Sequence, residues 1–425
     1  MRKILFFIAI LLVAISCKNT QVQHKSSPHI LKFYFGYHKN VPGIEQITFT
    51  VDTFDCTIYN TDSIIYEANL TKMLPYIVYK GSPSKKQFNG TDWNSVDSID
   101  FSHPVQYRLV SNNKKQEATY TITLNKHTVD PEEIVWNKQN DMVLDGTWLN
   151  SKACAYNNLF YVFVQQDSNP ENLDLYTGVD ANSLQKAATM PCNIQLNTIQ
   201  AHNGKLYAIS TDNKNLCVYE NNVWEETASF TEGTLQQLIG SLNGTLYIAC
   251  VVENNAKLAT YNNIAISIDN TAQLPNQFAL PGATPLTTPH GLYLLGGLEQ
   301  NKAQNCVISS HNGFYWTNIL NQTGQYAYSP RYQATVAYYQ NIIFIFGGLT
   351  EQGTSVQEHY YSTNNGYSWN IQKETQNLPD NYQYQAGTDA LVLQDNLYII
   401  GPSESQSSRM SIWKGRIRKA DFKIK

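Results

Sequence analysis

The chain has 425 residues, a formal net charge of −4 and a pI near 6.1, so it has no general attraction to nucleic acid or to anionic membranes. Only 15% of the residues are charged whereas 12% are aromatic, with 28 tyrosines, which excludes a disordered chain and a solvated helical array. This composition predicts an exported all-β protein, and nucleic acid is set aside as a partner.

The N-terminus predicts export and lipid attachment. A basic pair at positions 2 and 3 precedes an apolar run over residues 4–15, which is shorter than the roughly 20 residues that span a bilayer and has the layout of a secretory signal peptide. Ser16 directly before Cys17 resembles a bacterial lipobox, in which the cysteine is acylated, although Ala14 stands where leucine is usual. Acylation would tether the chain to the membrane. The alternative is an ordinary signal peptide that contains a cysteine.

Two folded modules are predicted after the signal peptide of residues 1–17 and a polar, flexible tether over residues 18–29. Residues 30–127 form the first module, in which turns separate strands that alternate apolar with polar positions. About 100 residues of this pattern is the size of an Ig-like β-sandwich. No Cys…Trp…Cys spacing marks an antibody-type domain. The expected strands are Ile47–Val51, Cys56–Tyr59, Tyr76–Tyr79, Val105–Val110 and Ala118–Leu124.

A short sequence motif is repeated along residues 128–425. A turn pair such as Asn203-Gly204 or Asn243-Gly244 is followed each time by a strand with an aromatic residue, as expected for a type I′ hairpin. The other expected turn pairs are Asn157-Asn158, His290-Gly291, Gln340-Asn341 and Asp395-Asn396. The aromatic positions 161, 207, 247, 293, 344 and 398 lie 46, 40, 46, 51 and 54 residues apart. This period, with several short strands per unit, predicts a six-bladed β-propeller.

The ring of blades is expected to close through a strand from outside the repeats. Ile134–Trp136 is an apolar strand before the first repeat, and its backbone groups need a partner. We expect it to pair with Met410–Gly415 of the last blade. The expected blades span residues 146–192, 193–231, 232–277, 278–325, 326–381 and 382–422.

The first module resembles a known group of surface proteins. Phe101–Tyr107 and Ala118–Ile122 are similar to the closing strands of Ig-like, cadherin-like modules at the front of Bacteroidetes surface lipoproteins. With Asn60–Ile64, Asp97–Asp100 and the linker Val129–Pro131, nearly the whole chain resembles one family of such lipoproteins. The resemblance implies an Ig-like module, a six-bladed Kelch-like propeller and a place in the envelope, and it implies no activity.

The last blades carry the Kelch-like residues. Leu294–Gly297 and Phe344–Gly348 each end in a double glycine and closely resemble the Kelch repeat, the second with Arg331 upstream. Ser210 and Cys250 stand where the double glycine would lie in earlier blades. The Kelch-like interpretation therefore depends mainly on the later blades.

Motifs of common enzyme classes are missing from the sequence. There is no HExxH, Walker loop, GxSxG elbow or EF-hand run, and no closely spaced Cys and His pairs for zinc. A sialidase needs three arginines that converge from different blades, but the propeller has Arg331 and three arginines close together near the C-terminus. Other glycosidases need two carboxylates, and Asp389 is the main acid expected on an inner strand. We therefore assign no catalytic residue, metal or cofactor.

Two outer hairpins resemble the Asp-box of sialidases, Ser-x-Asp-x-Gly-x-Thr-Trp, which is a structural turn at the edge of a blade. They are Ser309–Trp316 and Ser362–Trp369, with His311 and Asn364 in place of the aspartate. An Asx turn, a glycine with positive φ and a packed tryptophan explain every position without a ligand. These hairpins are predicted to be structural.

The histidines and cysteines are also predicted to be structural. His202 and His290 lie at or beside hairpin turns, where a solvated histidine is expected. The cysteines after Cys17 include no CxxC pair, so buried free thiols are expected, with disulfides as the alternative. These cysteines are Cys56, Cys154, Cys192, Cys217, Cys250 and Cys306.

The segments that enter the inner strands form the best candidate ligand surface, at one rim of the propeller. Aromatic faces with scattered hydrogen-bonding groups suit sugar rings, and an exposed patch of them indicates a ligand. Packing of these side chains between blades is the alternative. The candidate residues are Trp148, Tyr326, Tyr328, Arg331, Tyr382 and Tyr384.

Together these patterns predict a monomeric, lipid-anchored, non-catalytic binding or scaffold protein of the outer membrane, on its periplasmic face or the cell surface. The first module would be a spacer, and the propeller would bind a glycan or another envelope protein. The alternative function is that of a glycoside hydrolase or lyase acting on an envelope or dietary glycan. That alternative requires facing carboxylates at the mouth of the channel.

Overall fold

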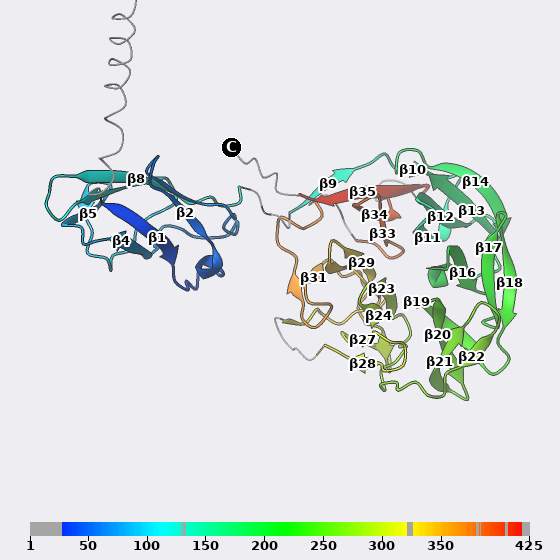
Figure 1. Ribbon diagram of the computed structural model, residues 1–425. Helices are drawn as coiled ribbons and strands as arrows, with labels where there is room; N and C mark the ends of the chain where they lie inside the picture. The colour runs from blue at the N-terminus through cyan, green and yellow to red at the C-terminus, as the bar shows by residue number, and fades with distance from the viewer. Residues whose placement is uncertain are drawn as a thin grey trace, which may run out of the picture. The chain divides into compact units, whose positions relative to one another are not determined.

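The chain folds into two compact units that divide between Pro131 and Glu132, and no α-helix occurs among the described residues (Figure 1). The prediction of an all-β chain is therefore confirmed. The predicted signal peptide, Cys17 and nearly all of the tether lie outside the described residues. The computed structural model describes residues 28–128, 130, 133–320, 326–379, 382, 384–403 and 407–418.

The first unit has two sheets packed around one hydrophobic core, as expected for a β-sandwich. The small sheet pairs β1 (His29–Phe35) with β4 (Pro75–Lys80). The large sheet has the order β2-β3-β8-β7-β5-β6, in which β3 and β8 are parallel and the other neighbours antiparallel. Its strands are β2 (Phe49–Asp52), β3 (Thr57–Asn60), β5 (Lys85–Phe88), β6 (Thr91–Asp92), β7 (Val105–Val110) and β8 (Glu117–Thr123).

Aromatic side chains fill the core between these sheets. Phe33 and Phe35 of β1 are buried and meet Phe49 and Phe101 edge to face, with centroid distances of 5.2–6.1 Å. Edge-to-face contacts of this kind add to the stabilisation from burial. The inward aromatic residues alternate with outward residues along β1, so the small sheet has one dry and one exposed face.

The second unit is a six-bladed β-propeller, as predicted (Figure 1). Blades 1–5 are four-stranded antiparallel sheets that follow the chain in order. Blade 1 contains β11 (Trp148–Tyr156), β12 (Leu159–Gln166), β13 (Asn172–Gly178) and β14 (Gln185–Pro191), and blade 2 contains β15 (Gln200–His202), β16 (Lys205–Ile209), β17 (Asn215–Glu220) and β18 (Val223–Ser229). Blade 3 contains β19 (Thr234–Leu242), β20 (Thr245–Val252), β21 (Asn255–Tyr261) and β22 (Ile266–Ile268).

The later blades have shorter outer strands. Blade 4 also carries a side hairpin of β25 (Leu298–Glu299) and β26 (Lys302–Ala303) between its second and third strands. Blade 4 contains β23 (Thr284–Thr288), β24 (Gly291–Leu295), β27 (Val307–Ser310) and β28 (Thr317–Asn318), and blade 5 contains β29 (Thr335–Tyr339), β30 (Ile342–Phe346), β31 (Tyr360–Ser362) and β32 (Asn370–Ile371).

Blade 6 combines the two ends of the propeller, which confirms the predicted closing strand. It contains β33 (Asp389–Leu393), β34 (Asn396–Pro402) and β35 (Arg409–Ile417). Its fourth position is filled by β9 (Ile134–Lys138) and β10 (Met142–Val143), both antiparallel to β35. Trp136 faces Gly415, where a Cβ would approach its ring to 2.6 Å, so glycine provides the space for the indole.

The strand turns confirm four of the six predicted pairs and correct two. Both residues of Asn203-Gly204, for example, have positive φ, at 45° and 72°. In blade 4 the turn falls one residue earlier than predicted, because Gly291 is already paired with Thr288. In blade 6 the positive-φ pair is Gln394-Asp395, and Asn396 begins β34. The sequence pattern identified these hairpins but placed two of them one residue too late.

Candidate functional site

The double glycines of blades 4 and 5 allow the linkers to the next blades to pass close by. A Cβ at Gly296, where φ is 66°, would lie 2.3 Å from the carbonyl oxygen of Arg331. A Cβ at Gly347, where φ is 54°, would lie 2.1 Å from the ring of Tyr384. Glycine removes both the clash and the cost of a left-handed backbone. The linkers that were predicted to form the rim are therefore anchored over these glycines.

Arg331 is completely buried and locks its linker to blade 5. Its Nε donates to the carbonyl of Ser329 at 2.9 Å, and Nη1 donates to the carbonyls of Gly347 at 2.6 Å and Glu358 at 2.9 Å. The guanidinium also lies 5.1 Å from the centroid of the Tyr360 ring, a cation–π contact. Because its donors face the protein, Arg331 has a structural role.

The six predicted rim residues do not form one exposed surface, and three of them require a correction. Tyr328, Arg331 and Tyr384 are buried and hydrogen-bonded between segments. The Tyr328 hydroxyl donates to the carbonyl of Cys306 at 2.7 Å, and the Tyr384 hydroxyl bonds Thr335 Oγ1 at 3.2 Å. Packing between blades, the alternative weighed for these residues, is what the structure shows for these three.

The other three rim residues reach the surface to different degrees. Tyr326 is 48% exposed beside the outer edge of blade 5, where its carbonyl accepts a hydrogen bond from Trp369 N. Tyr382 is half-buried against Trp413, with ring centroids 6.3 Å apart. Trp148 is half-buried beside the loop at Gly387. Tyr326 and Tyr382 lie on two different linkers, and Trp148 is the first residue of the inner strand β11.

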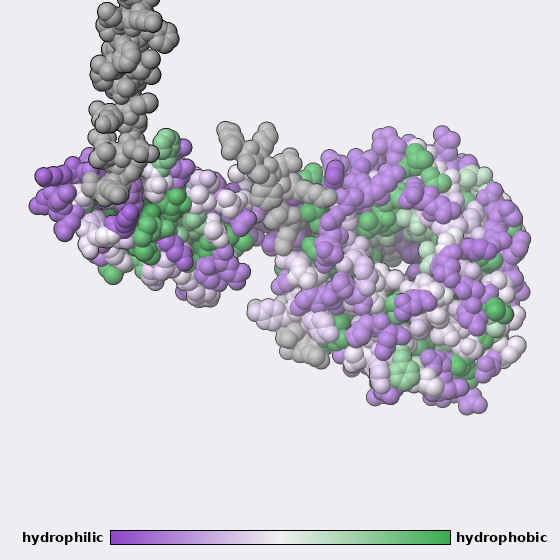
Figure 2. Space-filling model, in the orientation of Figure 1, coloured by the Kyte–Doolittle hydropathy of each residue, from purple (hydrophilic) through white to green (hydrophobic). Residues whose placement is uncertain are grey.

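The inner strands β11, β15, β19, β23, β29 and β33 surround the centre of the propeller, where Figure 2 shows the surface hollowed. Among these six strands, all of them described, Asp389 is the one acidic residue. One oxygen accepts from Lys152 Nζ at 2.6 Å and the other from Ala153 N at 2.7 Å. Both oxygens of this carboxylate are therefore engaged at the joint between blades 6 and 1.

The residues near this ion pair have shifted pKa values with clear causes. Burial alone would lower the pKa of Lys152, but the adjacent Asp389 outweighs it and the pKa rises above its ordinary value. Burial raises the pKa of Cys154 to about 12, so its thiol stays protonated and unreactive at neutral pH. Lys152 therefore stays charged, and it is paired with Asp389 beside an inert thiol.

Other polar side chains on the inner strands tie blade 3 to blade 4, blade 4 to blade 5, and blade 5 to blade 6. In each case a side chain of one inner strand donates to a backbone carbonyl at the start of the following one, at 2.5–2.8 Å. Each of these bonds provides a donor for a buried backbone carbonyl that would otherwise have no partner. The donor and acceptor pairs are Gln237 with Ala283, Thr284 with Ala334, and Thr335 with Thr388.

His202 is buried at the joint between blades 2 and 3, which corrects the prediction of a solvated side chain. Its Nε2 bonds Asn263 Oδ1 at 3.0 Å and its Nδ1 bonds the Ser241 hydroxyl at 2.8 Å. Its Nε2 also lies 3.1 Å from Asn203 Nδ2, so the two ring nitrogens contact one hydroxyl and two side-chain amides. The rings of Tyr207 and Tyr261 lie 5.5 and 6.4 Å away. Burial lowers the pKa of His202.

Both Asp-box-like hairpins are structural turns, as the sequence predicted, but one assignment changes. Asn364 accepts from Ser368 N at 3.0 Å, and Trp369 Nε1 donates to the carbonyl of Gly366. In the other hairpin Asn312 takes this role, accepting from the backbone N–H groups of residues 314 and 315 at 2.9 and 3.0 Å. His311 is exposed and does not replace the aspartate. That turn is one residue shorter, so direct alignment to the motif selected the wrong side chain.

The remaining cysteines are free thiols in the structure. Among the described residues, no helix is long and apolar enough to cross a bilayer. The same residues contain no group of three or more His, Cys, Asp or Glu side chains placed to hold a metal ion. The predicted lipidation site, Cys17, is outside the described residues.

Fold and site together define a two-module all-β protein whose second module is a propeller with an ion-paired centre. The chain belongs to the DUF6242 family: residues 130–425 match the DUF6242 beta propeller domain, and residues 15–124 match the domain of unknown function (DUF6242) N-terminal domain. This assignment agrees with the prediction of a family that has two modules and no assigned activity. No match was found among curated proteins.

Two solved structures are similar to the chain at low identity. The structure of YjhT is 12% identical, with a TM-score of 0.47, and the match covers 63% of this chain and 94% of YjhT. A DUF4623 family protein from Bacteroides eggerthii DSM 20697 is 9% identical, with a TM-score of 0.41, and the match covers 93% of this chain and all of that one.

Proposed function

We propose that this chain is a lipid-anchored binding protein of the cell envelope, with Cys17 as the acylated residue, the first module as an Ig-like spacer and the Kelch-like propeller as the recognition head. The resemblance to Bacteroidetes surface lipoproteins supports placement at the outer membrane. A glycan or another envelope protein is the ligand, and the chain acts as a monomer.

The observation that carries a binding role is the state of Asp389. A glycosidase needs one carboxyl group to act as an acid and a second to act as a base or nucleophile. Asp389 is the one acid on the six inner strands, and it is held by Lys152 and Ala153 N. This arrangement supports recognition without hydrolysis at the centre of the propeller.

The exposed parts of the predicted rim remain the proposed ligand surface of the propeller. Tyr326 presents an aromatic ring to solvent, and Trp148 and Tyr382 are half-buried. Aromatic rings of this kind stack on the apolar faces of sugars and of protein partners. Tyr328, Arg331 and Tyr384 would support this surface from below, since their side chains are buried.

A glycan array probed with residues 18–425 tests this function. We expect retention of specific glycans that weakens at least tenfold when Trp148 or Tyr326 is changed to alanine, with no cleavage of the retained glycans. The change Tyr315→Ala removes another exposed tyrosine and is the matched control. Cleavage products from a bound glycan would instead support the hydrolase or lyase alternative, and unchanged retention would place the ligand elsewhere.

Acylation at Cys17 has its own test. Mass spectrometry of the membrane fraction should find a diacyl or triacyl group on Cys17 as the first residue. Cys17→Ser should release the protein into the soluble fraction, because a chain without acyl groups loses its membrane anchor. Retention of the serine variant in the membrane would contradict the lipid anchor.

A further inference from the structure

The outer face of the small sheet in the first module is exposed and apolar. In the register of β1 and β4, Tyr34 faces Tyr76 and Lys32 faces Val78. Tyr76 is 46% and Val78 43% exposed, and Leu31, at the β-bulge of β1, is 59% exposed. Figure 2 shows hydrophobic residues at the surface of this module over the position of β1. We call these five residues the tyrosine face.

The aromatic side chains of the tyrosine face are held in place. The rings of Tyr34 and Tyr76 stack with their centroids 5.3 Å apart and an interplanar angle of 17°. Lys32 Nζ lies 4.7 Å from the centroid of the Tyr34 ring, and a Cβ at Gly36 would lie 3.3 Å from the Tyr76 ring. Tyr37, which follows directly, is 77% exposed. The face is therefore a preorganised, partly aromatic surface.

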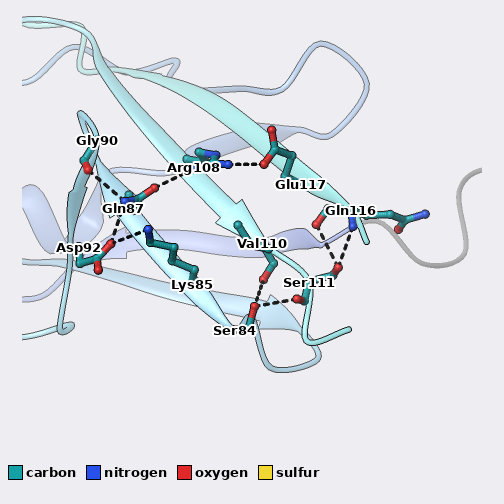
Figure 3. A network of polar contacts seen from close by, with 10 residues as sticks. All are labelled: Ser84, Lys85, Gln87, Gly90, Asp92, Arg108, Val110, Ser111, Gln116 and Glu117. Atoms are coloured by element: carbon teal, nitrogen blue, oxygen red, sulfur yellow. Dashed lines mark hydrogen bonds and ion pairs between the residues drawn. The ribbon is translucent and has the colours of Figure 1, made fainter. Parts of the chain in front are cut away.

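The charged side chains of the small sheet are all positive. Neither β1 nor β4 contains an acidic residue, whereas they contribute Lys32 and Lys80, both exposed. On the large sheet, by contrast, two pairs of opposite charges meet: Arg108 bonds Glu117, and Lys85 lies 3.4 Å from Asp92 (Figure 3). The lysines of the small sheet are thus available to an anionic partner.

We propose that the tyrosine face lies on the headgroup region of the membrane to which the chain is anchored. Tyrosine is enriched where lipid meets water, because its ring is apolar and its hydroxyl is polar. Leu31 and Val78 would enter the apolar edge of this region, and Lys32 and Lys80 would meet anionic phosphate groups. Every residue type on the face therefore matches one layer of a bilayer surface.

The length of the tether supports a membrane as the partner. His29 begins β1 twelve residues after Cys17, and an extended chain spans about 3.5 Å per residue. The face is thus held within roughly 40 Å of the lipid anchor, which makes contact with the bilayer an intramolecular event at high effective concentration. This step depends on the proposed acylation of Cys17, and the test below separates the two proposals.

Quenching by brominated lipids measures the contact. Tyr37→Trp places a reporter beside the tyrosine face, and Phe54→Trp places one in the turn between β2 and β3 of the other sheet, where the native side chain is 86% exposed. The acylated full-length chain is reconstituted in brominated phosphatidylcholine with phosphatidylglycerol. We expect the Tyr37→Trp reporter to be quenched at least twofold more than the Phe54→Trp reporter, after subtraction of the parent chain's quenching. Equal quenching at both positions would overturn the proposal.

A second arrangement keeps the test valid if Cys17 carries no lipid. Residues 18–425 with an N-terminal polyhistidine tag are bound to vesicles that contain a nickel-chelating lipid, so that the tether is supplied artificially. The same difference between the two reporters is expected, reduced by half or more when Lys32 and Lys80 are changed to glutamate. Failure of acylation alone would refute the anchor, whereas loss of the difference here would refute the membrane face.

A glycan partner would give another result. Lipid-free protein would bind a glycan array, and Tyr34→Ala with Tyr76→Ala would abolish that binding while the reporters stayed unquenched on vesicles. This outcome would assign the face to sugars and overturn its role at the membrane.

Discussion

The late and early blades of the propeller are joined in different ways. Between blades 4, 5 and 6, linkers cross over glycines at close range, and buried Arg331 and Tyr384 fill the space. Between blades 2 and 3, where the double glycine is missing, a polar cluster around neutral His202 makes the joint. The first kind of joint depends on volume and the second on a protonation state. The two should therefore fail under different perturbations.

Gly347→Ala should have the largest effect, because the added methyl group would clash with the linker between blades 5 and 6. Its Cβ would lie 2.1 Å from the Tyr384 ring, and overpacking of this kind costs about 3 kcal/mol in the free energy of unfolding. Gly353→Ala is the matched control, since it has a similar positive φ of 78° but no atom within 4 Å. The control should lose about 1 kcal/mol. Equal losses in urea unfolding would show that the close approach is not important.

Arg331→Met should be the next largest change at the late joint. It removes the donors to the carbonyls of Gly347 and Glu358, and buried acceptors without partners should cost about 2 kcal/mol. Arg416→Met, at an exposed position of β35, should change the free energy of unfolding by less than about 0.5 kcal/mol. A loss as small for Arg331 as for Arg416 would contradict the locking role.

Acid should weaken both kinds of joint through different histidines. His359 accepts a hydrogen bond from Gly347 N through Nδ1 at 3.3 Å. Burial and the nearby Arg331 lower the pKa of His359 to about 4, and burial lowers the pKa of His202. A histidine whose pKa falls on folding binds fewer protons in the folded state than in the unfolded state. Its contribution to the free energy of unfolding is therefore fully present above about pH 6.5, the ordinary pKa of histidine in an unfolded chain, and is lost as the pH falls.

The variants His202→Gln and His359→Gln should therefore flatten the decline in the free energy of unfolding between pH 6.5 and 4, each by part of the total. His311→Gln, at an exposed turn, should leave the slope unchanged. If the His202 and His359 variants keep the parent slope, neither ring is required to be neutral at these joints.

The smallest expected effect compares two adjacent turn residues. Asn312→Ala removes two hydrogen bonds to the turn backbone and should cost about 1 kcal/mol. His311→Ala should cost less than about 0.5 kcal/mol, because the side chain is exposed. Thermal unfolding measures both, and the opposite order would restore His311 as the residue of the Asp-box.

The sequence predicted what depends on local chemistry. Asn-Gly pairs followed by aromatic strands identified the blades, and the unpartnered strand at Trp136 identified the closure, because a backbone without partners must find an edge. The strand β1 was not identified among the predicted strands, although its inward Phe33 and Phe35 form much of the first core.

The burial of the candidate site was less predictable, because it depends on contacts between distant segments. Tyr384 and Gly347 touch across 37 residues, and no local pattern states that a linker crosses at that point. His202 illustrates the same limit: its partners Ser241 and Asn263 come from the next blade. An aromatic residue before an inner strand can thus face solvent or the neighbouring blade with the same sequence pattern.

The closing strand has a consequence for the order of synthesis. β9 is translated before any blade, yet its partner β35 begins at Arg409, about 270 residues later. At the usual 5–20 residues per second, the ribosome would need roughly 15–50 s to produce that partner. During this interval the backbone of β9 has no partner strand, so a chaperone that binds extended segments would have its natural target at Ile134–Lys138.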